Sequence, residues 1–237
     1  MHSFARARRH HSEQDDPSAT SGRVDKTTKG LILSGGWRYD LTEWLIDPFM
    51  FRGQLRVLRR RTLDLARLQP GDVVLDVGCG TGTLALDMAQ RVGSAGRVAG
   101  IDPSAQQIGR AHAKAARRRL PIEFQIGVIE QLPFPEQTFD VVLSTLMMHH
   151  LPAPLKRQGL AEIARVLKPG GRLIIADFTR KQEHQRRAAH FHAGGSSLHE
   201  LAILVTNAGF SRVETDEMQP ARRSAFPGAG FVRAYKS

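Results

Sequence analysis

The chain has 237 residues, a formal net charge of +11 and a pI of about 10.7. This length suffices for one α/β domain with a tail, and no apolar run approaches the roughly 18 residues that a membrane-spanning helix needs. The one cysteine, Cys79, cannot form an internal disulfide, so we expect a protein of the reducing cytoplasm.

The first part of the chain divides by composition. Residues 1–29 are basic and polar and lack the apolar centre of a secretory signal, so we expect a disordered tail. Residues 30–68 contain both tryptophans and a helical pattern over 51–68, which predicts a lid and a helix with arginines on one face. Residues 69–237 are expected to form the main domain.

The most informative stretch is V-L-D-V-G-C-G-T-G at 74–82. An apolar run interrupted by Asp76 predicts a buried parallel strand, and a helical pattern follows the glycines. Glycine lets the backbone approach a ligand closely, and a helix start offers free N–H groups. We therefore predict a ligand site at Gly78, Gly80 and Gly82, with the Asp76 carboxylate accepting hydrogen bonds from a cationic or polyhydroxylated group.

A second predicted strand, 96–101, ends in an Asp-Pro-Ser sequence whose Asp102 lies twenty positions after Gly82. That spacing is typical of an acid that binds the ribose hydroxyls of a nucleoside. We therefore expect Asp102 and Pro103 beside the glycine loop. The G-x-G-x-x-A pattern from Gly80 also fits a dinucleotide site, so a nicotinamide or flavin cofactor stays open, although the acid before the first glycine would repel a pyrophosphate.

Further elements alternate along the chain. We predict helices from Ser104 to about Arg119, over 154–167 and over 198–208, and strands over 121–126, 139–144, 171–178, 211–217 and 231–236. Such alternation implies an α/β fold with a doubly wound, mostly parallel seven-stranded sheet. The last two strands have no crossover helix between them, so they must pair antiparallel as a C-terminal hairpin.

Three later segments extend the pattern: G-V-I-E-Q-L-P-F from 127, F-D-V-V from 139 and L-K-P-G-G from 167. With the glycine loop, they make the chain resemble the class I S-adenosylmethionine-dependent methyltransferases, and within them the small-molecule branch that includes the ubiquinone/menaquinone C-methyltransferases. The resemblance runs from about residue 39 to the C-terminus and says little about the substrate. It implies a Rossmann-like fold, S-adenosylmethionine as cofactor and S-adenosylhomocysteine as product.

The resemblance also implies roles for single residues. It places the methionine part of the cofactor on the glycine loop under Tyr39, the ribose on Asp102 and the adenine beside Ile129, and it puts Thr145 at the cofactor as well. Tyr39 is equally well explained as an aromatic residue of the core or of the lid. The family usually carries an acidic or amide residue where Val128 stands, so only the backbone N–H of Ile129 is left as a predicted contact to the adenine edge.

Methyl transfer requires an aligned acceptor and an absence of water, and carbon or oxygen acceptors must also lose a proton. A Met-Met-His-His sequence follows the predicted strand over 139–144, and its His150 is our candidate for a base or an acceptor-orienting group. A packing role for the same histidine stays open. We expect no metal site, although four histidines lie in or near an irregular segment: His184, His190, His192 and His199.

The expected acceptor is a small, lipophilic, quinone-like ring methylated on carbon or oxygen. Arginine clusters within 52–67, 110–119 and 180–187 keep two alternatives open: N-methylation of an amine such as a phospholipid headgroup, and nucleic-acid binding or RNA modification. The same clusters can be solvated helix faces or a peripheral contact with an anionic membrane. Aromatic residues do not interleave with them, which disfavours single-strand nucleic-acid binding by stacking.

Overall fold

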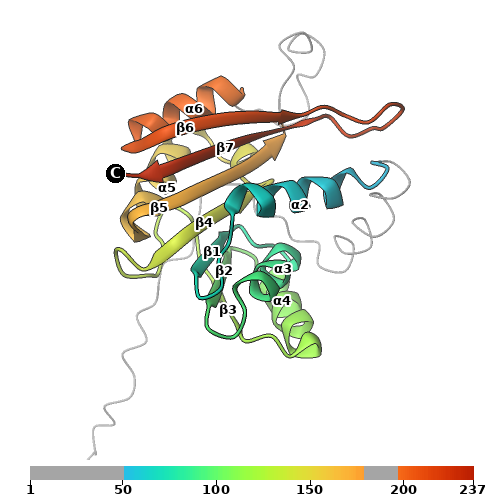
Figure 1. Cartoon of the computed structure of the whole chain (residues 1–237), viewed down its shortest axis with the longest axis vertical. Coiled ribbons are helices and arrows are strands. Elements are labelled where there is room, and N and C mark those ends of the chain that lie inside the picture. The colour runs from blue at the N-terminus through green and yellow to red at the C-terminus, as the bar shows by residue number, and fades with distance from the viewer. Residues whose placement is uncertain (1–50, 179–196) are drawn as a thin grey trace, which may run out of the picture.

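The computed structural model describes residues 51–178 and 197–237 (Figure 1). Within these ranges the chain forms one seven-stranded sheet of order β3-β2-β1-β4-β5-β7-β6. Strands β1 to β5 are parallel, and β7 runs antiparallel to both β5 and β6. The strands are β1 Val73–Val77, β2 Arg97–Asp102, β3 Ile122–Ile126, β4 Phe139–Thr145, β5 Leu167–Phe178, β6 Phe210–Met218 and β7 Ala229–Lys236. The predicted sheet, with its antiparallel hairpin, is confirmed.

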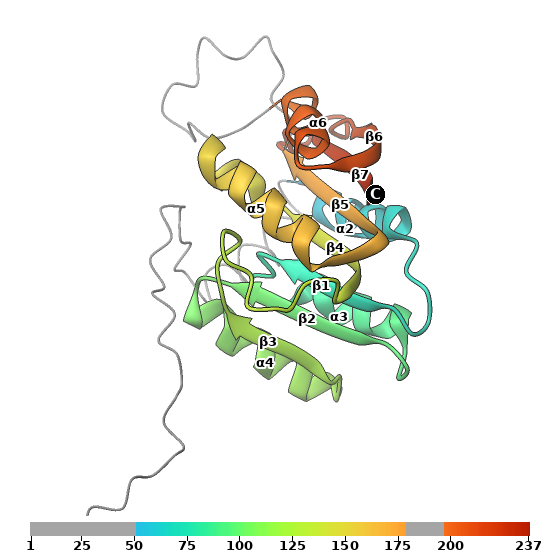
Figure 2. The same cartoon turned by 90° about the vertical axis from the view of Figure 1, so that its left-hand side faces the viewer.

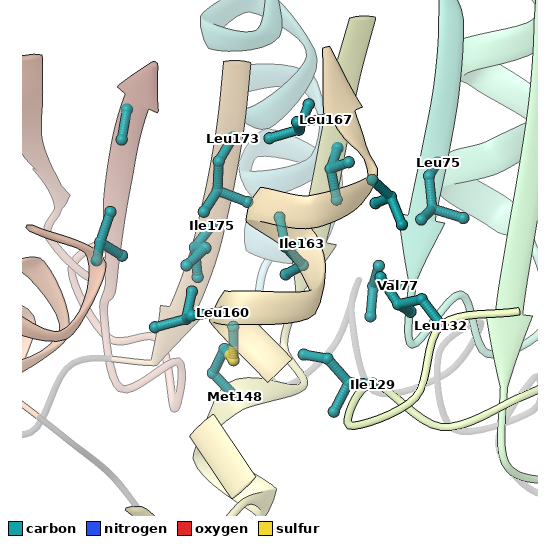
Figure 3. Packing of buried hydrophobic residues seen from close by; sticks show 14 of the residues in the cluster. Leu75, Val77, Ile129, Leu132, Met148, Leu160, Ile163, Leu167, Leu173 and Ile175 are labelled. Atoms are coloured by element: carbon teal, nitrogen blue, oxygen red, sulfur yellow. The ribbon is translucent and has the colours of Figure 1, made fainter. Parts of the chain in front are cut away.

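Helices cover both faces of this sheet (Figure 2). They are α2 Gln54–Ala66, α3 Thr83–Val92, α4 Ala105–Arg118, the short 3-10 helix η1 Met148–His150, α5 Ala153–Val166 and α6 Leu198–Asn207. In β1, Leu75 and Val77 pack with α5 and α6 on one face, where Figure 3 shows the side chains close by, and Val74 packs with α2, α3 and α4 on the other. Two-sided burial explains why this strand is almost continuously apolar.

The N-termini of helices α3 and α4 differ in whether a side chain caps them. Helix α4 begins as predicted, with the Ser104 hydroxyl accepting a hydrogen bond from the Gln107 N–H at 3.4 Å. Helix α3 begins at Gly82 without a side-chain cap. Its first N–H groups therefore remain available to a ligand at the end of β1.

Strand boundaries differ from the predicted ones near the L-K-P-G-G segment. Strand β5 begins at Leu167, four residues early, because Leu167 already pairs with Phe139 before the register shifts. None of the described helices has the length and apolar character to cross a bilayer. Residues 1–50 lie outside the described residues, so the predicted tail, the lid and the division between residues 68 and 69 stay predictions.

The order of the strands creates an opening at one end of the sheet. Strand β1 lies between β2 and β4, and Val77 pairs with both Ile101 and Ser144. The carboxyl ends of these three strands therefore lie side by side, with Asp102 and Thr145 as the last residues of β2 and β4. In open α/β sheets, ligands bind outside such a point, where the strand order reverses.

Candidate functional site

The glycine loop after β1 adopts backbone conformations that other residues rarely take. Gly78, Gly80 and Gly82 have φ angles of 75°, 52° and 76°. A Cβ on Gly78 would lie 2.5 Å from Met147 Cγ, and one on Gly82 would lie 2.8 Å from Phe124 Cζ. Glycine is therefore required at both positions for the chain to make this tight turn at the open end of the sheet.

Asp102 ties this loop to the end of β2. Its Oδ2 accepts a hydrogen bond from the Gly80 N–H at 3.1 Å, and its Oδ1 accepts one from the Ser104 N–H at 2.9 Å. Burial raises the pKa of the Asp102 carboxyl, and the two backbone hydrogen bonds partly offset that rise. Each carboxylate oxygen can accept a second hydrogen bond, so the oriented carboxylate can also receive ligand hydroxyls.

Asp76 is the most perturbed carboxyl group of the site. Its side chain is only 2% exposed, and no described residue donates a hydrogen bond to its Oδ2. Burial, with repulsion from Asp102, raises its pKa to about 7. An unpaired buried carboxyl group is unfavourable, and a cationic ligand group beside it would favour its ionised form.

The structure brings most of the predicted residues together. One cleft, here called the main cleft, is lined by Gly78, Gly80, Asp102, Pro103, Ile129, Thr145 and His150, among others. Asp76 lines an adjoining hollow, the inner hollow, which shares Gly78, Gly80 and Thr145 with the main cleft. Gly82 lines neither space, because it faces Phe124 behind the loop. Tyr39 lies outside the described residues.

The sequence of this chain is similar to those of known proteins. A domain family described as "Methyltransferase domain" matches residues 74–171. The ubiquinone/menaquinone biosynthesis C-methyltransferase of Teredinibacter turnerae is 32% identical over 90% of this chain and 88% of its own length. The chain belongs to the class I S-adenosylmethionine-dependent methyltransferases. The protein of the same name from Hydrogenovibrio crunogenus is 34% identical over 65% of this chain and 59% of its own length, so the match spans less than two thirds of that relative.

Solved structures agree on the architecture of this methyltransferase. A S-adenosylmethionine-dependent methyltransferase from Aquifex aeolicus has a TM-score of 0.67 at 22% identity, covering 86% of this chain and all of that one. The [4+2]-cyclase SpnF has a TM-score of 0.68 at 21% identity, covering 87% and 86% of the two chains. Since one of these is titled a cyclase, the likeness shows the fold and not the reaction.

The residues of the two spaces fit the cofactor of this family. Four buried oxygens there have no hydrogen-bond partner among the described residues: Asp76 Oδ2, Gln107 Oε1, Glu130 Oε2 and Thr145 Oγ1. Buried polar atoms are nearly always paired, so these oxygens indicate a ligand that carries several N–H and O–H groups. S-adenosylmethionine has such groups at its ammonium, its ribose and its adenine.

Two adjacent histidines of the methyltransferase follow β4. His150 lines the main cleft, as the sequence predicts. His149 is held by Asp177 at the end of β5: its Nδ1 lies 2.6 Å from Asp177 Oδ1, and its backbone N–H donates to Asp177 Oδ2 at 2.8 Å. The two imidazole rings are in contact, with their centroids 3.8 Å apart and their planes inclined at 45°. The buried carboxylate thus orients His149, and His149 in turn supports the ring of His150.

Three residues of the site lie in segments that the sequence patterns pointed to, but the patterns gave them no individual role. Asp177 and Glu130 have been described above, and Arg59 of α2 lines the inner hollow. The signal for Asp177 was present, because a polar residue at the end of an apolar strand is also what marked Asp76.

His199 is exposed at the start of α6, and the other three histidines of the group considered for a metal lie outside the described residues. In the part of the chain that the structure describes, no group of three or more His, Cys, Asp or Glu side chains could hold a metal ion.

Proposed function

We propose that this methyltransferase transfers the methyl group to a ring carbon or oxygen of a small, lipophilic, quinone-type acceptor. The observation that carries this proposal is the apolar wall of the main cleft, where Leu146, Met147 and Leu151 adjoin His150. An apolar ring fits such a wall, whereas a charged headgroup would lose hydration there without compensation. The names of the relatives, which refer to ubiquinone and menaquinone, support the same acceptor class.

In this proposal the chain holds the cofactor at three points. Asp76 accepts hydrogen bonds from the ammonium group, Asp102 accepts them from the ribose hydroxyls, and the Ile129 backbone N–H faces the adenine edge. Gly78, Gly80, Pro103 and Thr145 line the space between these points. When bound, S-adenosylmethionine supplies an electrophilic methyl group, and S-adenosylhomocysteine is the product.

We assign two tasks to the residues near the acceptor. The apolar side chains around Leu146 orient the ring and exclude water, which is most of what methyl transfer asks of a protein. The His150 imidazole accepts the proton that the acceptor gives up, because an imidazole nitrogen can act as a general base. Its neighbour His149, fixed by Asp177, keeps that ring in place.

The test offers the enzyme a choice of acceptors. Purified protein is incubated with S-adenosylmethionine labelled in the methyl group and with a demethylated quinol, phosphatidylethanolamine or transfer RNA, and the products are identified by mass spectrometry. We expect label on a carbon or oxygen of the quinol. Label on the headgroup amine or on the RNA, with none on the quinol, would replace this proposal by one of the alternatives.

We also propose that the protein works in the cytoplasm at an anionic membrane surface, from which it takes its acceptor. Helix α2 and the turn before it support this, because Val57 of the helix is 49% exposed and lies between the exposed Arg52 of the turn and the exposed Arg60 of the helix. The same helix contributes Leu55 and Leu58 to the lining of the inner hollow. Apolar and cationic groups side by side at the edge of a site match a lipid surface.

Sedimentation with vesicles tests the membrane contact. We expect binding to phosphatidylglycerol vesicles but not to phosphatidylcholine vesicles, and loss of binding in Arg52→Glu/Arg60→Glu. The control, Arg118→Glu/Arg119→Glu, makes the same charge change at the exposed end of α4 and should bind as the wild type does. Equal loss in both variants would indicate nonspecific charge attraction, as would tight, steeply salt-dependent binding to RNA.

A further inference from the structure

Glu130 is a carboxylate of the main cleft that has no partner so far. Glu130 lines the cleft beside Val128 and Ile129, and its buried Oε2 has no hydrogen-bond partner among the described residues. We propose that Glu130 accepts a hydrogen bond from the exocyclic amino group of the adenine, and so selects a 6-aminopurine over a 6-oxopurine. This assignment adds to the cofactor-binding mode proposed above and rests on it.

The loop that carries Glu130 is held in place by α5. The Gln158 side-chain amide donates to the Glu130 carbonyl at 3.1 Å, and Glu162 accepts a hydrogen bond from the Leu132 N–H at 2.8 Å. Arg165 pairs with Glu162 and donates to the Leu132 carbonyl at 3.0 Å. Figure 3 shows Ile129 and Leu132 on the side of the loop that packs toward this helix. Because α5 holds the backbone of the loop at Glu130 and at Leu132, the Glu130 side chain starts from a fixed place.

A tight turn separates Glu130 from the position that usually carries the acceptor in this family. The Gln131 N–H donates to the Val128 carbonyl at 3.3 Å, and the two residues form an isolated antiparallel bridge. Valine cannot accept a hydrogen bond through its side chain. The carboxylate nearest to Val128 along the loop is that of Glu130, two residues later in the same turn.

The remaining donors of the cofactor already have acceptors in the proposed seating. The ammonium lies at Asp76 and the ribose hydroxyls at Asp102, which leaves the adenine amino group. A 6-aminopurine presents two N–H donors there, and a carboxylate can only accept. A 6-oxopurine would turn an oxygen toward the carboxylate, so two acceptors would face each other and binding would weaken.

Titration calorimetry with two ligands tests this assignment. S-adenosylhomocysteine and S-inosylhomocysteine differ at the purine 6-position and share the ribose and the amino acid. We expect the wild type to prefer S-adenosylhomocysteine by about 10- to 100-fold, which corresponds to one hydrogen bond to a charged group. In Glu130→Gln the amide can donate as well as accept, so the preference should fall to about threefold or less. Glu123→Gln, an exposed control on β3, should keep the wild-type preference.

Either of two results would overturn the role of Glu130: a wild type that binds both ligands equally, or an unchanged preference in Glu130→Gln. The ratio of the two ligand affinities in the wild type tests the role of Glu130 even if Glu130→Gln does not fold. The variant Asp102→Asn tests the binding of the ribose separately from the selection of the purine. Both ligands carry the same ribose, so their affinities should fall by the same factor. If the wild type bound neither ligand, the proposed binding of the cofactor would be refuted together with this role of Glu130.

Discussion

Gly159 of α5 offers a sharp test of how the protein builds its adenine end. A Cβ at this position would lie 2.6 Å from Ile129 Cγ1 and 2.7 Å from Ile129 Cδ1. Ile129 is only 5% exposed, so its side chain has little room to move away. Gly159→Ala should therefore push the loop that carries Ile129 toward the main cleft.

Two opposing effects set the size of the change. Alanine is favoured over glycine within a helix by about 1 kcal/mol. Overpacking of a filled core costs about 1–3 kcal/mol. Since the loop is anchored to α5 and cannot relax freely, we expect a net loss of about 1 kcal/mol in the free energy of unfolding. Affinity for S-adenosylhomocysteine should fall about tenfold, because the Ile129 backbone moves with its side chain.

Urea unfolding and titration calorimetry measure the two effects. The matched control is Gly109→Ala on α4, where nothing lies within 4 Å of the added Cβ and the residue is exposed. This control should gain about 1 kcal/mol of stability and bind the ligand as before. If Gly159→Ala gained stability like the control and bound normally, the packing of Ile129 against α5 would not shape the cofactor site.

Three further outcomes are expected. The pKa of Asp76 is raised to about 7, so its carboxyl group is protonated below that pH in the free protein. The affinity for S-adenosylhomocysteine, measured by calorimetry, should therefore rise with pH up to about 7 and then level off. An equally steep pH dependence in Asp76→Asn would refute this. His150→Ala should lower turnover about 100-fold while ligand affinity stays within about twofold, and a parallel fall in both would mean that His150 binds the cofactor instead. Arg172 caps the end of α2, with its guanidinium donating to the Ala66 carbonyl at 2.6 Å and pairing with Asp72 at 2.9 Å. In urea unfolding, Arg172→Ala should therefore lower the free energy of unfolding by about 1–3 kcal/mol, and its ligand affinity should be unchanged.

Local sequence patterns were enough to predict the order of the helices and strands, the glycine turn after β1 and the acid at the end of β2. An apolar run followed by glycines specifies a buried strand and a tight turn regardless of what lies elsewhere in the chain. The spacing between that turn and Asp102 predicted the acid at the next strand end. The expected start of β5 at residue 171 was wrong because Leu167 already pairs with Phe139 across the sheet, a contact that no local pattern records.

The partnerships within the site depended on the tertiary structure, because they join residues far apart in the sequence. His149 and Asp177 are 28 residues apart and meet only because β4 and β5 are neighbours in the sheet. Likewise, α5 packs on the face of the sheet beside the Ile129 loop, and this leaves the Glu130 carboxylate in the main cleft without a partner. Strand and turn propensities follow from neighbouring residues, whereas a carboxylate acquires or lacks a partner only when distant elements pack together.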